Sequence, residues 1–290
     1  MKESDHTIRI MVAAHKPYWM PGDPAYLPIH VGRALPPDLD LGYTGDDTGD
    51  NISAKNPHYC ELTAIYWAWK NLQADYVGLV HYRRYFTKRE VHGSEAKRAQ
   101  VLKTADWENL LAKAPVVVPD KRKYYIESNE SHYLHAHHPE GLTVTRQIVE
   151  EKYPDYMPAY NLVMNRTWAH MFNMFVMRKD LYDQYCAWLF AILGELERRV
   201  DISTYTPYEA RIYGFVSELL LDVWLEHNHV PYIEQNVSFM EPQNWLKKGG
   251  RFLCRKITSS IRGGQQDNYV ACLSTGYANR SSDDESQVAA

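Results

Sequence analysis

The sequence has few cysteines, no long apolar run and no excess of positive charge, and each of these absences excludes a class of protein. Its four cysteines stand far apart with no CxxC pair, so neither a disulfide framework nor a common zinc motif is present. No run of about 18 apolar residues occurs, which excludes a membrane-spanning helix. The formal net charge of -4 argues against a protein that coats the phosphates of nucleic acid.

What the chain does contain points to a folded, cytoplasmic protein. Apolar residues make up 45% of its 290 residues, enough for most of the chain to fold around a core. Aromatic residues reach 13%, and their amphipathic rings suit nucleobases and sugars as well as an ordinary core. The apolar run nearest the N-terminus, Ile8–Ala14, is too short for a secretory signal, so we expect a protein that stays inside the cell.

Strands and helices alternate along the first 120 residues. Ile8–Ala14, Tyr76–His81 and Pro115–Pro119 are short runs of apolar and β-branched residues, which is typical of buried strands. Apolar side chains between Pro57 and Leu72 recur at spacings of three and four, and a short helix is expected around Asp106–Ala114. This alternation predicts an α/β fold with a mostly parallel sheet flanked by helices.

The other segments are a long loop and a mainly helical second half. The stretch Met20–Ser53 is rich in Pro, Gly and Asp, and we expect it to be irregular. Helices are predicted at Glu140–Tyr153, Lys179–Arg199 and about 207–227, and short strands at Met171–Met177 and Tyr232–Phe239. We expect one domain over residues 1–245, with halves 1–120 and 121–245, and a tail over 246–290 that is basic, then polar and partly disordered.

Polar side chains follow the first two predicted strands, at the sheet edge where parallel sheets bind ligands. His15 and Lys16 come after the first strand, and the second ends in the string His81–Arg84. Two guanidinium groups and an imidazole suit a diphosphate, with an arginine paired to a structural carboxylate as the alternative. Because side chains alternate along a strand, Arg83 is expected on the face of His81, and Arg84 points away unless the chain has already turned.

Three other patterns allow both a chemical and a structural interpretation. The string Asp46–Ser53 offers carboxylates and amides to a ribose or a base, or else forms a turn that caps the next helix. The four histidines of His132–His138 match no zinc-binding spacing, so a loop with a substrate-facing histidine is favoured over the zinc site of a hydrolase. Arg211 and Glu218 lie on one helix face, where burial would raise the pKa of the carboxyl and suit it to act as a base. An ordinary charge pair is the alternative there.

Longer strings carry a resemblance to a known family. They are DTGDNIS at 47–53, NPHYCELTAIYWAWKN at 56–71 and GLVHYRRYF at 78–86, with further matches at 173–177, 185–190 and 211–218. Over about residues 8–240 the chain resembles a bacterial glycosyltransferase family, long described as a domain of unknown function in capsular and exopolysaccharide biosynthesis proteins. The resemblance implies a GT-A-like, Rossmann-type fold and sugar transfer, with galactofuranose from its UDP donor as the case associated with family members.

The resemblance also implies roles for individual residues. The donor is expected to contact His15, Asp50, Asn51, Asn56, His81, Arg83 and Arg84. The acceptor is expected to contact His137, Asn173 and Arg211. Glu218 would deprotonate the acceptor, while Arg83 and Arg84 stabilise the departing diphosphate. The chain departs from the family at Gly141, where an Asp is usual, and at Leu219, where an Arg is usual.

The same resemblance bears on cofactors. GT-A enzymes usually hold a divalent cation on an Asp-x-Asp motif at the strand end that the string His81–Arg83 occupies here, and this strand end carries no such motif. Guanidinium groups can supply positive charge to the leaving group. We therefore expect no metal and no other cofactor, with Mg²⁺ or Mn²⁺ held by Asp46, Asp47 and Asp50 as the alternative.

These features predict a cytoplasmic, UDP-sugar-dependent hexosyltransferase that extends a lipid-linked capsule, O-antigen or exopolysaccharide glycan. Residues 246–262 carry six basic side chains and no acid, so this stretch would rest on the anionic face of the inner membrane, with a solvated linker as the alternative. A non-catalytic carbohydrate-binding protein on the same fold is the alternative function. Nucleic acid is not expected as a partner.

Overall fold

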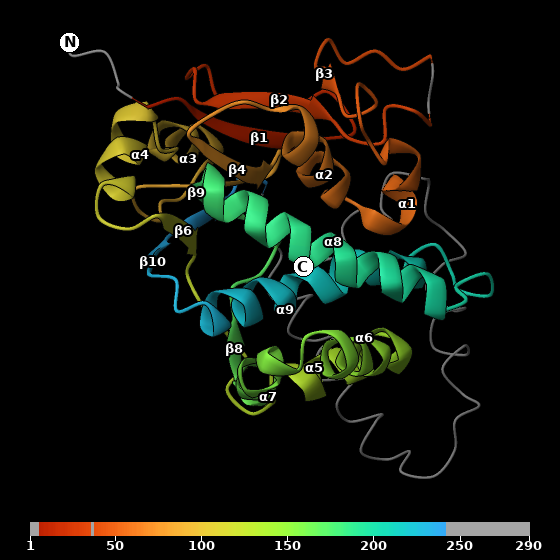
Figure 1. Ribbon diagram of the computed structural model, residues 1–290. Coiled ribbons are helices and arrows are strands. Elements are labelled where there is room, and N and C mark those ends of the chain that lie inside the picture. The colour runs from red at the N-terminus through yellow and green to blue at the C-terminus, as the bar shows by residue number, and fades with distance from the viewer. Residues whose placement is uncertain (1–5, 36–37, 242–290) are drawn as a thin grey trace. The chain divides into compact units, whose positions relative to one another are not determined.

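The structure is a computed structural model in which residues 6–35 and 38–241 are described. The predicted tail over residues 246–290, with its basic stretch, lies outside the described residues. A mixed, mostly parallel sheet of nine strands runs through the described part and is flanked by helices, which confirms the α/β fold class (Figure 1). Within the described ranges, no helix combines the length and the apolar character needed to cross a bilayer.

The centre of the sheet is the parallel pair β1 (Ile8–Ala14) and β4 (Tyr76–His81), both at their predicted bounds. The strand order across the sheet is β10-β6-β9-β4-β1-β2-β3. The other strands on this path are β2 (Tyr26–His30), β3 (Thr44–Gly45), β6 (Val116–Pro119), β9 (Phe175–Arg178) and β10 (Tyr232–Gln235). Strand β9 is antiparallel to both of its neighbours, and the remaining pairs on the path are parallel.

Two predicted segments differ from the structure. The stretch Met20–Ser53 is not wholly irregular, because β2 pairs with β1 inside it and β3 extends the sheet. Pro28 within β2 hides this strand from a propensity argument. The strand predicted at Met171–Met177 begins only at Phe175, because Phe172 and Asn173 have φ values of 78° and 52° and turn the chain before it.

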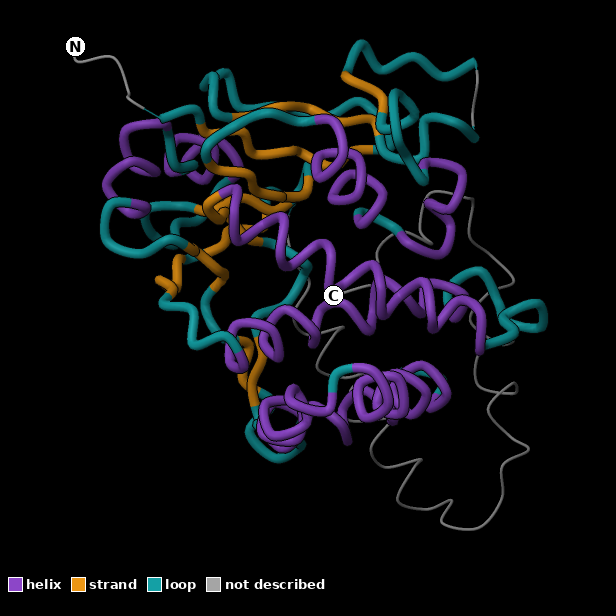
Figure 2. The backbone as a smooth tube through the Cα atoms, in the orientation of Figure 1, coloured by secondary structure: helices purple, strands orange, loops and turns teal. Residues whose placement is uncertain are grey.

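Helices cover both faces of the sheet. On one face lie α2 (Leu62–Asn71), α8 (Lys179–Arg199, as predicted) and α9 (Ile212–His227), and on the other α4 (Thr104–Leu111). The remaining helices are α1 (Asn56–Tyr59), α3 (Ser94–Gln100), α5 (Asn129–Ala136), α6 (Pro139–Lys152) and α7 (Met157–Asn165). Alternate side chains of β1 serve the two cores: Met11 packs toward the first face and Val12 toward the second. In Figure 2 most strands lie in the upper half of the view, α5, α6 and α7 lie below them, and β8 lies beside α7.

Short additional strands position side chains near the carboxyl end of β4. Strand β5 (Arg84–Phe86) turns back antiparallel to β4, and β11 (Val237–Phe239) pairs with β5. A separate two-stranded ribbon joins β7 (Arg122–Lys123) to β8 (Trp168–Ala169). These elements bring residues that are far apart in the sequence to one edge of the sheet.

The close approach of β4 and β9 depends on Gly78. A Cβ atom on Gly78 would lie 2.6 Å from Cγ2 of Val176 and 2.7 Å from the carbonyl oxygen of Phe175. We therefore expect Gly78→Ala to lower the free energy of unfolding by about 1–3 kcal/mol, since the strands must separate. Urea unfolding followed by circular dichroism measures this.

Gly194 provides the matched control, because it lies in α8 and a Cβ atom there would have no neighbour within 4 Å. Gly194→Ala should raise the free energy of unfolding by up to about 1 kcal/mol, since alanine favours the helix. Equal stability of the two alanine variants would contradict the packing argument.

Candidate functional site

The string His81–Arg84 forms a tight hairpin at the carboxyl end of β4. His81 ends β4, Arg84 begins β5, and the two are register partners across the turn. Register partners point to the same face of a sheet, so Arg84 lies on the side of His81. From the sequence, Arg84 was expected to point away from His81 unless the chain turned after the strand. The structure has that turn.

His81 and Arg84 belong to a group of six charged or titratable side chains that we call the charged cluster. Its members are Glu61, His81, Arg84, Arg122, Arg211 and Glu218. They come from the start of α2, the β4–β5 hairpin, β7, and the beginning and second turn of α9. Each of the six is half-buried.

Glu218 is the most strongly perturbed carboxyl of the cluster. Burial and the nearby Glu61 raise its pKa to about 7, although Arg122, Arg84 and Arg211 oppose this rise. At neutral pH the carboxyl is thus close to its midpoint, where it can both take up and release a proton. The rise in pKa that was predicted from burial is present, and the role of Glu218 as a base stays a prediction.

Arg84 and Arg83 occupy different environments. Burial lowers the pKa of Arg84 to about 10, so the group stays charged at neutral pH. Its guanidinium lies 4.6 Å from the ring centre of Phe172 and 5.1 Å from that of Phe239. Arg83 lies over the Tyr82 ring and pairs with Glu241 at 3.3 Å. The ion pair expected as the alternative for one arginine is therefore present at Arg83.

His15 borders the cluster at the end of β1. Its pKa is lowered by burial, and Lys16, Arg83 and Arg211 add to that effect. Its ring meets the ring of Tyr82 edge-on at 5.3 Å, and Lys16 lies over the same ring. The predicted donor residues His15, His81, Arg83 and Arg84 are thus brought together at one sheet edge.

Glu61 is a cluster member that sequence reasoning missed. Its Oε1 accepts a hydrogen bond of 2.6 Å from Nδ2 of Asn173. Asn173, predicted to face the acceptor, is buried and also donates to the Gly214 carbonyl and accepts from the Ser217 hydroxyl. Its amide is therefore used to position Glu61. No spacing or motif rule marks Glu61, since it lies inside a family string without a periodic partner.

The turn before Glu61 is strained. Cys60 adopts φ 52° and ψ -133°, a conformation that residues other than glycine rarely take. Its sulfur accepts a hydrogen bond of 3.0 Å from Nε of Arg211, which holds that guanidinium in place. Burial raises the pKa of the Cys60 thiol to about 11, so it stays protonated at neutral pH. The predicted acceptor residue Arg211 is thus anchored inside the cluster.

His137 connects to the cluster through an aromatic contact. Its ring stacks on Phe215 at 4.0 Å, and the Arg211 guanidinium lies 5.4 Å from the centre of the same ring. Gly141 lies in the first turn of α6. A Cβ atom on Gly141 would meet the Tyr133 hydroxyl and approach Cγ1 of Ile212 to 2.7 Å. This position has no room for the Asp that is usual in the family.

Two predicted donor residues, Asp50 and Asn51, lie in a turn instead. Asp50 accepts from the Tyr66 hydroxyl, and its backbone contacts the side chain of Asn71 at the end of α2. That end is about 15 Å from Glu61, since α2 has ten residues. Asn51 donates to backbone carbonyls within its own turn. Their role in donor binding stays a prediction, and in the structure both side chains stabilise the turn.

Asn56 supports the strained turn from behind. Its Nδ2 donates to the Cys60 carbonyl at 2.8 Å and to the Thr63 hydroxyl at 3.1 Å. A Cβ atom on Gly32 would lie 2.8 Å from its side chain, so Asn56 is also packed against the loop after β2. Donor binding by Asn56 stays a prediction as well.

The candidate metal ligands do not gather. Asp46 is fully buried, and its carboxylate accepts hydrogen bonds from the amides of Gly32 and Arg33 and from the Ser53 hydroxyl. It holds the loop after β2 and has little capacity left for a cation. Across residues 6–35 and 38–241, no three His, Cys, Asp or Glu side chains are grouped as metal ligands would be.

The four histidines of His132–His138 do not form the loop that was predicted. His132 and His135 lie in α5, and His137 and His138 follow its end. His132 stacks on Tyr124 and contacts Glu127, whereas His138 stacks on Tyr205 and contacts Glu209. His135 contacts Glu127 as well, so the string divides between Glu127 and Glu209, which disfavours one zinc ion shared by the four rings.

Arg122 is the second cluster member without a sequence signal. It lies in β7, and its charge lowers the pKa of Glu218 against the effect of burial. The basic and aromatic residues around Arg122 are typical of an exposed segment. Only the pairing of β7 with β8 shows that Arg122 belongs to the cluster.

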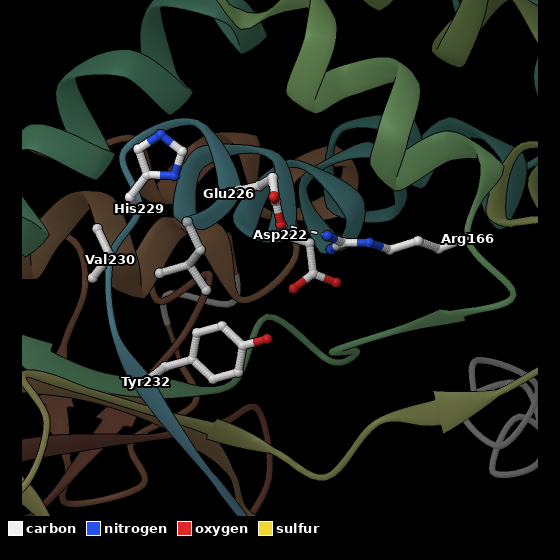
Figure 3. A pocket seen from close by; sticks show the side chains of 7 residues that line it. Arg166, Asp222, Glu226, His229, Val230 and Tyr232 are labelled. Atoms are coloured by element: carbon white, nitrogen blue, oxygen red, sulfur yellow. Dashed lines mark hydrogen bonds and ion pairs between the residues drawn. The ribbon is translucent and has the colours of Figure 1, made fainter.

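A cavity of about 120 Å³ lies further along α9 (Figure 3). Its lining residues are Arg166, Asp222, Leu225, Glu226, His229, Val230 and Tyr232. Arg166 and Glu226 form an ion pair there. None of the predicted site residues lines this cavity. We therefore place the candidate site at the charged cluster, which unites a perturbed carboxyl with three guanidinium groups.

The comparisons with known proteins show the family of the chain. The family model described as Domain of unknown function (DUF4422) matches residues 9–229. The solved apo structure of WbbM, a bifunctional glycosyltransferase, has a TM-score of 0.75 and 31% identity, covering 81% of this chain and 46% of that one. The present chain therefore spans about half the length of WbbM. None of the curated proteins compared with the chain matches it. Because the match covers most of the chain, the chain belongs to the DUF4422 family.

Proposed function

We propose that the chain is a glycosyltransferase that moves a hexosyl group from a UDP-sugar to a glycan acceptor. The observation that carries the proposal is the charged cluster, in which a carboxyl with a pKa of about 7 lies among three guanidinium groups. The likeness to WbbM, itself a bifunctional glycosyltransferase, supports sugar transfer in general. Galactofuranose, which the family resemblance implies, is the donor sugar that we propose.

The positive groups of the site suit a departing diphosphate. Arg84, Arg122 and Arg211 lie in the cluster, while Arg83 and Lys16 border it. Planar guanidinium groups bind phosphate oxygens in pairs, and donors fixed in advance stabilise the charge that develops on the leaving group. We therefore propose that these side chains, and no divalent ion, neutralise UDP as it leaves.

Glu218 is the proposed base. The acceptor hydroxyl oxygen bonds to the anomeric carbon of the donor, and the bond from that carbon to the diphosphate oxygen breaks. Its electron pair leaves with UDP, and the hydroxyl proton passes to Glu218. A carboxyl with a pKa of about 7 suits this step, because the group is ionised in a large share of molecules at neutral pH.

The proposed acceptor is a lipid-linked capsule, O-antigen or exopolysaccharide chain, which would bring the protein to the cytoplasmic face of the inner membrane. His137 supports an acceptor subsite on the α5–α6 side, since its ring stacks on Phe215 beside Arg211. Sugar rings pack well on such flat aromatic surfaces, because an aromatic face offers apolar area with a polar edge.

A donor screen tests the proposal directly. The full chain is incubated with a panel of UDP-sugars, including UDP-galactofuranose, with and without polysaccharide acceptors, and both UDP and products are followed by mass spectrometry. We expect acceptor-dependent release of UDP from one donor, unchanged by EDTA. Binding of glycans without turnover of any donor would instead favour a carbohydrate-binding protein. Loss of turnover in EDTA, restored by Mg²⁺ or Mn²⁺, would overturn the metal-independent step.

Arg83→Ala tests the diphosphate site. We expect transfer to fall by about 100-fold or more, because a fixed cation is removed from the leaving group. The melting temperature should change little, since the pair with Glu241 is partly exposed to solvent. Arg178→Ala is the matched control, as Arg178 pairs with Asp180 at the surface and lies outside the cluster. Turnover close to wild type in Arg83→Ala would remove this arginine from the mechanism.

Glu218→Gln tests the base through activity. The wild-type kcat/KM is expected to rise with pH through about 7, because only the ionised carboxyl accepts a proton. The glutamine variant should lose about 100- to 10,000-fold in kcat while still binding UDP. Glu226→Gln, on the same helix but paired with Arg166, should keep wild-type activity and the same pH profile. If kcat/KM of Glu218→Gln still rose with pH through about 7, another group would be the base.

The same carboxyl should make stability depend on pH. The pKa of Glu218 is about 7 in the folded chain and about 4.3 in an unfolded one, so folding favours the protonated form. The stabilisation is present below pH 4 and is lost as pH rises through 7. Relative to Glu218→Gln, the wild type should lose about 3 kcal/mol of unfolding free energy between pH 4 and pH 8. Parallel stability curves from chemical denaturation would contradict this.

A further inference from the structure

His81 has one ring nitrogen that the chain uses and one that it leaves accessible. Nε2 lies 2.7 Å from the carbonyl oxygen of Phe172. A carbonyl oxygen only accepts hydrogen bonds, so Nε2 carries the proton and donates it. Burial lowers the pKa of His81, and Arg84 and Arg83 add to this effect while Glu61 opposes it. The ring is therefore neutral at pH 7, and Nδ1 holds a lone pair.

A ligand can reach this lone pair. Nδ1 of His81 has no hydrogen-bond partner among the described residues, yet it is not one of the enclosed polar atoms of that part of the chain. His81 is half-buried, and its ring interacts with the charges of Glu61, Arg84 and Arg83. In the neutral ring only one nitrogen carries a proton, and here that nitrogen is Nε2. Nδ1 can therefore only accept a hydrogen bond.

The Phe172 carbonyl, which fixes the proton of His81 on Nε2, lies in a strained segment of backbone. Phe172 and Asn173 both have positive φ values, 78° and 52°, a backbone conformation that residues other than glycine rarely adopt. On one side, the carboxylate of Asp222 accepts from the backbone amide of His170 at 2.9 Å and lies 2.5 Å from its Nδ1. On the other side, the side chain of Asn173 bonds to Glu61. The segment between these two anchors aims the Phe172 carbonyl at His81.

We propose that His81 binds a sugar hydroxyl of the substrate through Nδ1, as the acceptor of a hydrogen bond, and so selects sugars that carry a hydroxyl at that position. This rests on the proposed function and assigns His81 a different part in it from the arginines. A lone pair repels phosphate oxygens, so the diphosphate role first predicted for His81 does not suit its neutral form. It does suit a hydroxyl, which brings its own proton.

His81 is also a poorer base than Glu218. Its pKa lies below the ordinary value for histidine, whereas that of Glu218 is raised to about 7. The proton of the reacting hydroxyl therefore passes to Glu218, and His81 is a specificity-determining residue. Discrimination of this kind is strong, because a substrate without the hydroxyl leaves a desolvated nitrogen unpaired.

The protonation state is tested on the full-length protein without substrate. Nitrogen NMR of ¹⁵N-histidine-labelled protein, with His81 assigned by loss of its signals in His81→Gln, reports which ring nitrogen carries a proton. We expect a neutral ring protonated on Nε2 at pH 7. A doubly protonated ring, or a proton on Nδ1, would overturn the proposal. This measurement needs no turnover, so it stands apart from any failure of the proposed transferase activity.

Two substitutions separate the two nitrogens. His81→Gln keeps an N–H that can reach the Phe172 carbonyl and removes the acceptor at the Nδ1 position, whereas His81→Asn keeps an oxygen near that position. We expect His81→Gln to lower kcat/KM for the UDP-sugar by about 10- to 100-fold, with the Kd of UDP unchanged. His81→Asn should retain more activity than His81→Gln. The reverse order, or a loss of UDP binding in His81→Gln, would contradict a sugar-binding role.

Deoxy substrates then identify the hydroxyl. Donor and acceptor sugars that lack single hydroxyl groups are compared in the wild type and in His81→Gln. For one deoxy sugar, kcat/KM should fall relative to the parent sugar in the wild type but hardly change in His81→Gln. The variant has already lost the nitrogen that binds this hydroxyl. A deoxy donor with this behaviour assigns His81 to the donor, and a deoxy acceptor assigns it to the acceptor. Equal losses in both proteins for every deoxy sugar would overturn the proposal.

Discussion

The burial of two carboxylates beside each other, Glu61 and Glu218, is the constraint on which the rest of this site depends. A buried charge without compensation costs several kcal/mol, and two like charges make it worse. The chain offsets this with Arg84, Arg122 and Arg211 and with the amide of Asn173. The compensation is incomplete at Glu218, since its pKa still rises to about 7. A fully neutralised cluster would be more stable, but its carboxyl would be a weaker base at neutral pH.

Strained backbone is the second cost that the site carries. Cys60, Phe172 and Asn173 all adopt positive φ values, and all three lie next to a cluster side chain. The turn at Cys60 places Glu61 and anchors Arg211, and the turn at Phe172 fixes the proton on His81. Both turns are held by hydrogen bonds from well-packed elements, above all Asn56 in α1 and Asp222 in α9. Rigid neighbours thus maintain a geometry that the local sequence would not adopt alone.

The parts of the fold with strong local patterns could be predicted from the sequence. Ile8–Ala14, Tyr76–His81 and Lys179–Arg199 have their predicted bounds, because apolar runs and helical periodicity are encoded within a few residues. Four of the six residues of the charged cluster could be identified from the sequence, and two could not. His81, Arg84, Arg211 and Glu218 follow from strand ends and helix faces or from the family strings. Glu61 and Arg122 join them only through the Asn173 contact and the β7–β8 pairing, which no short-range pattern encodes.

A site that uses guanidinium groups for a leaving diphosphate differs physically from one that uses a divalent ion. A cation in solution must be captured, whereas an arginine is always present and stays charged, even where burial lowers its pKa as at Arg84. The fixed charges must, however, be held apart from one another in the absence of substrate. Glu61 and Glu218 meet that need, so the proposed base and the carboxylate beside it also keep the arginines in place. On this reasoning the acidity of Glu218 and the affinity for the diphosphate are coupled, because arrival of a phosphate weakens the pull of the arginines on the carboxyl.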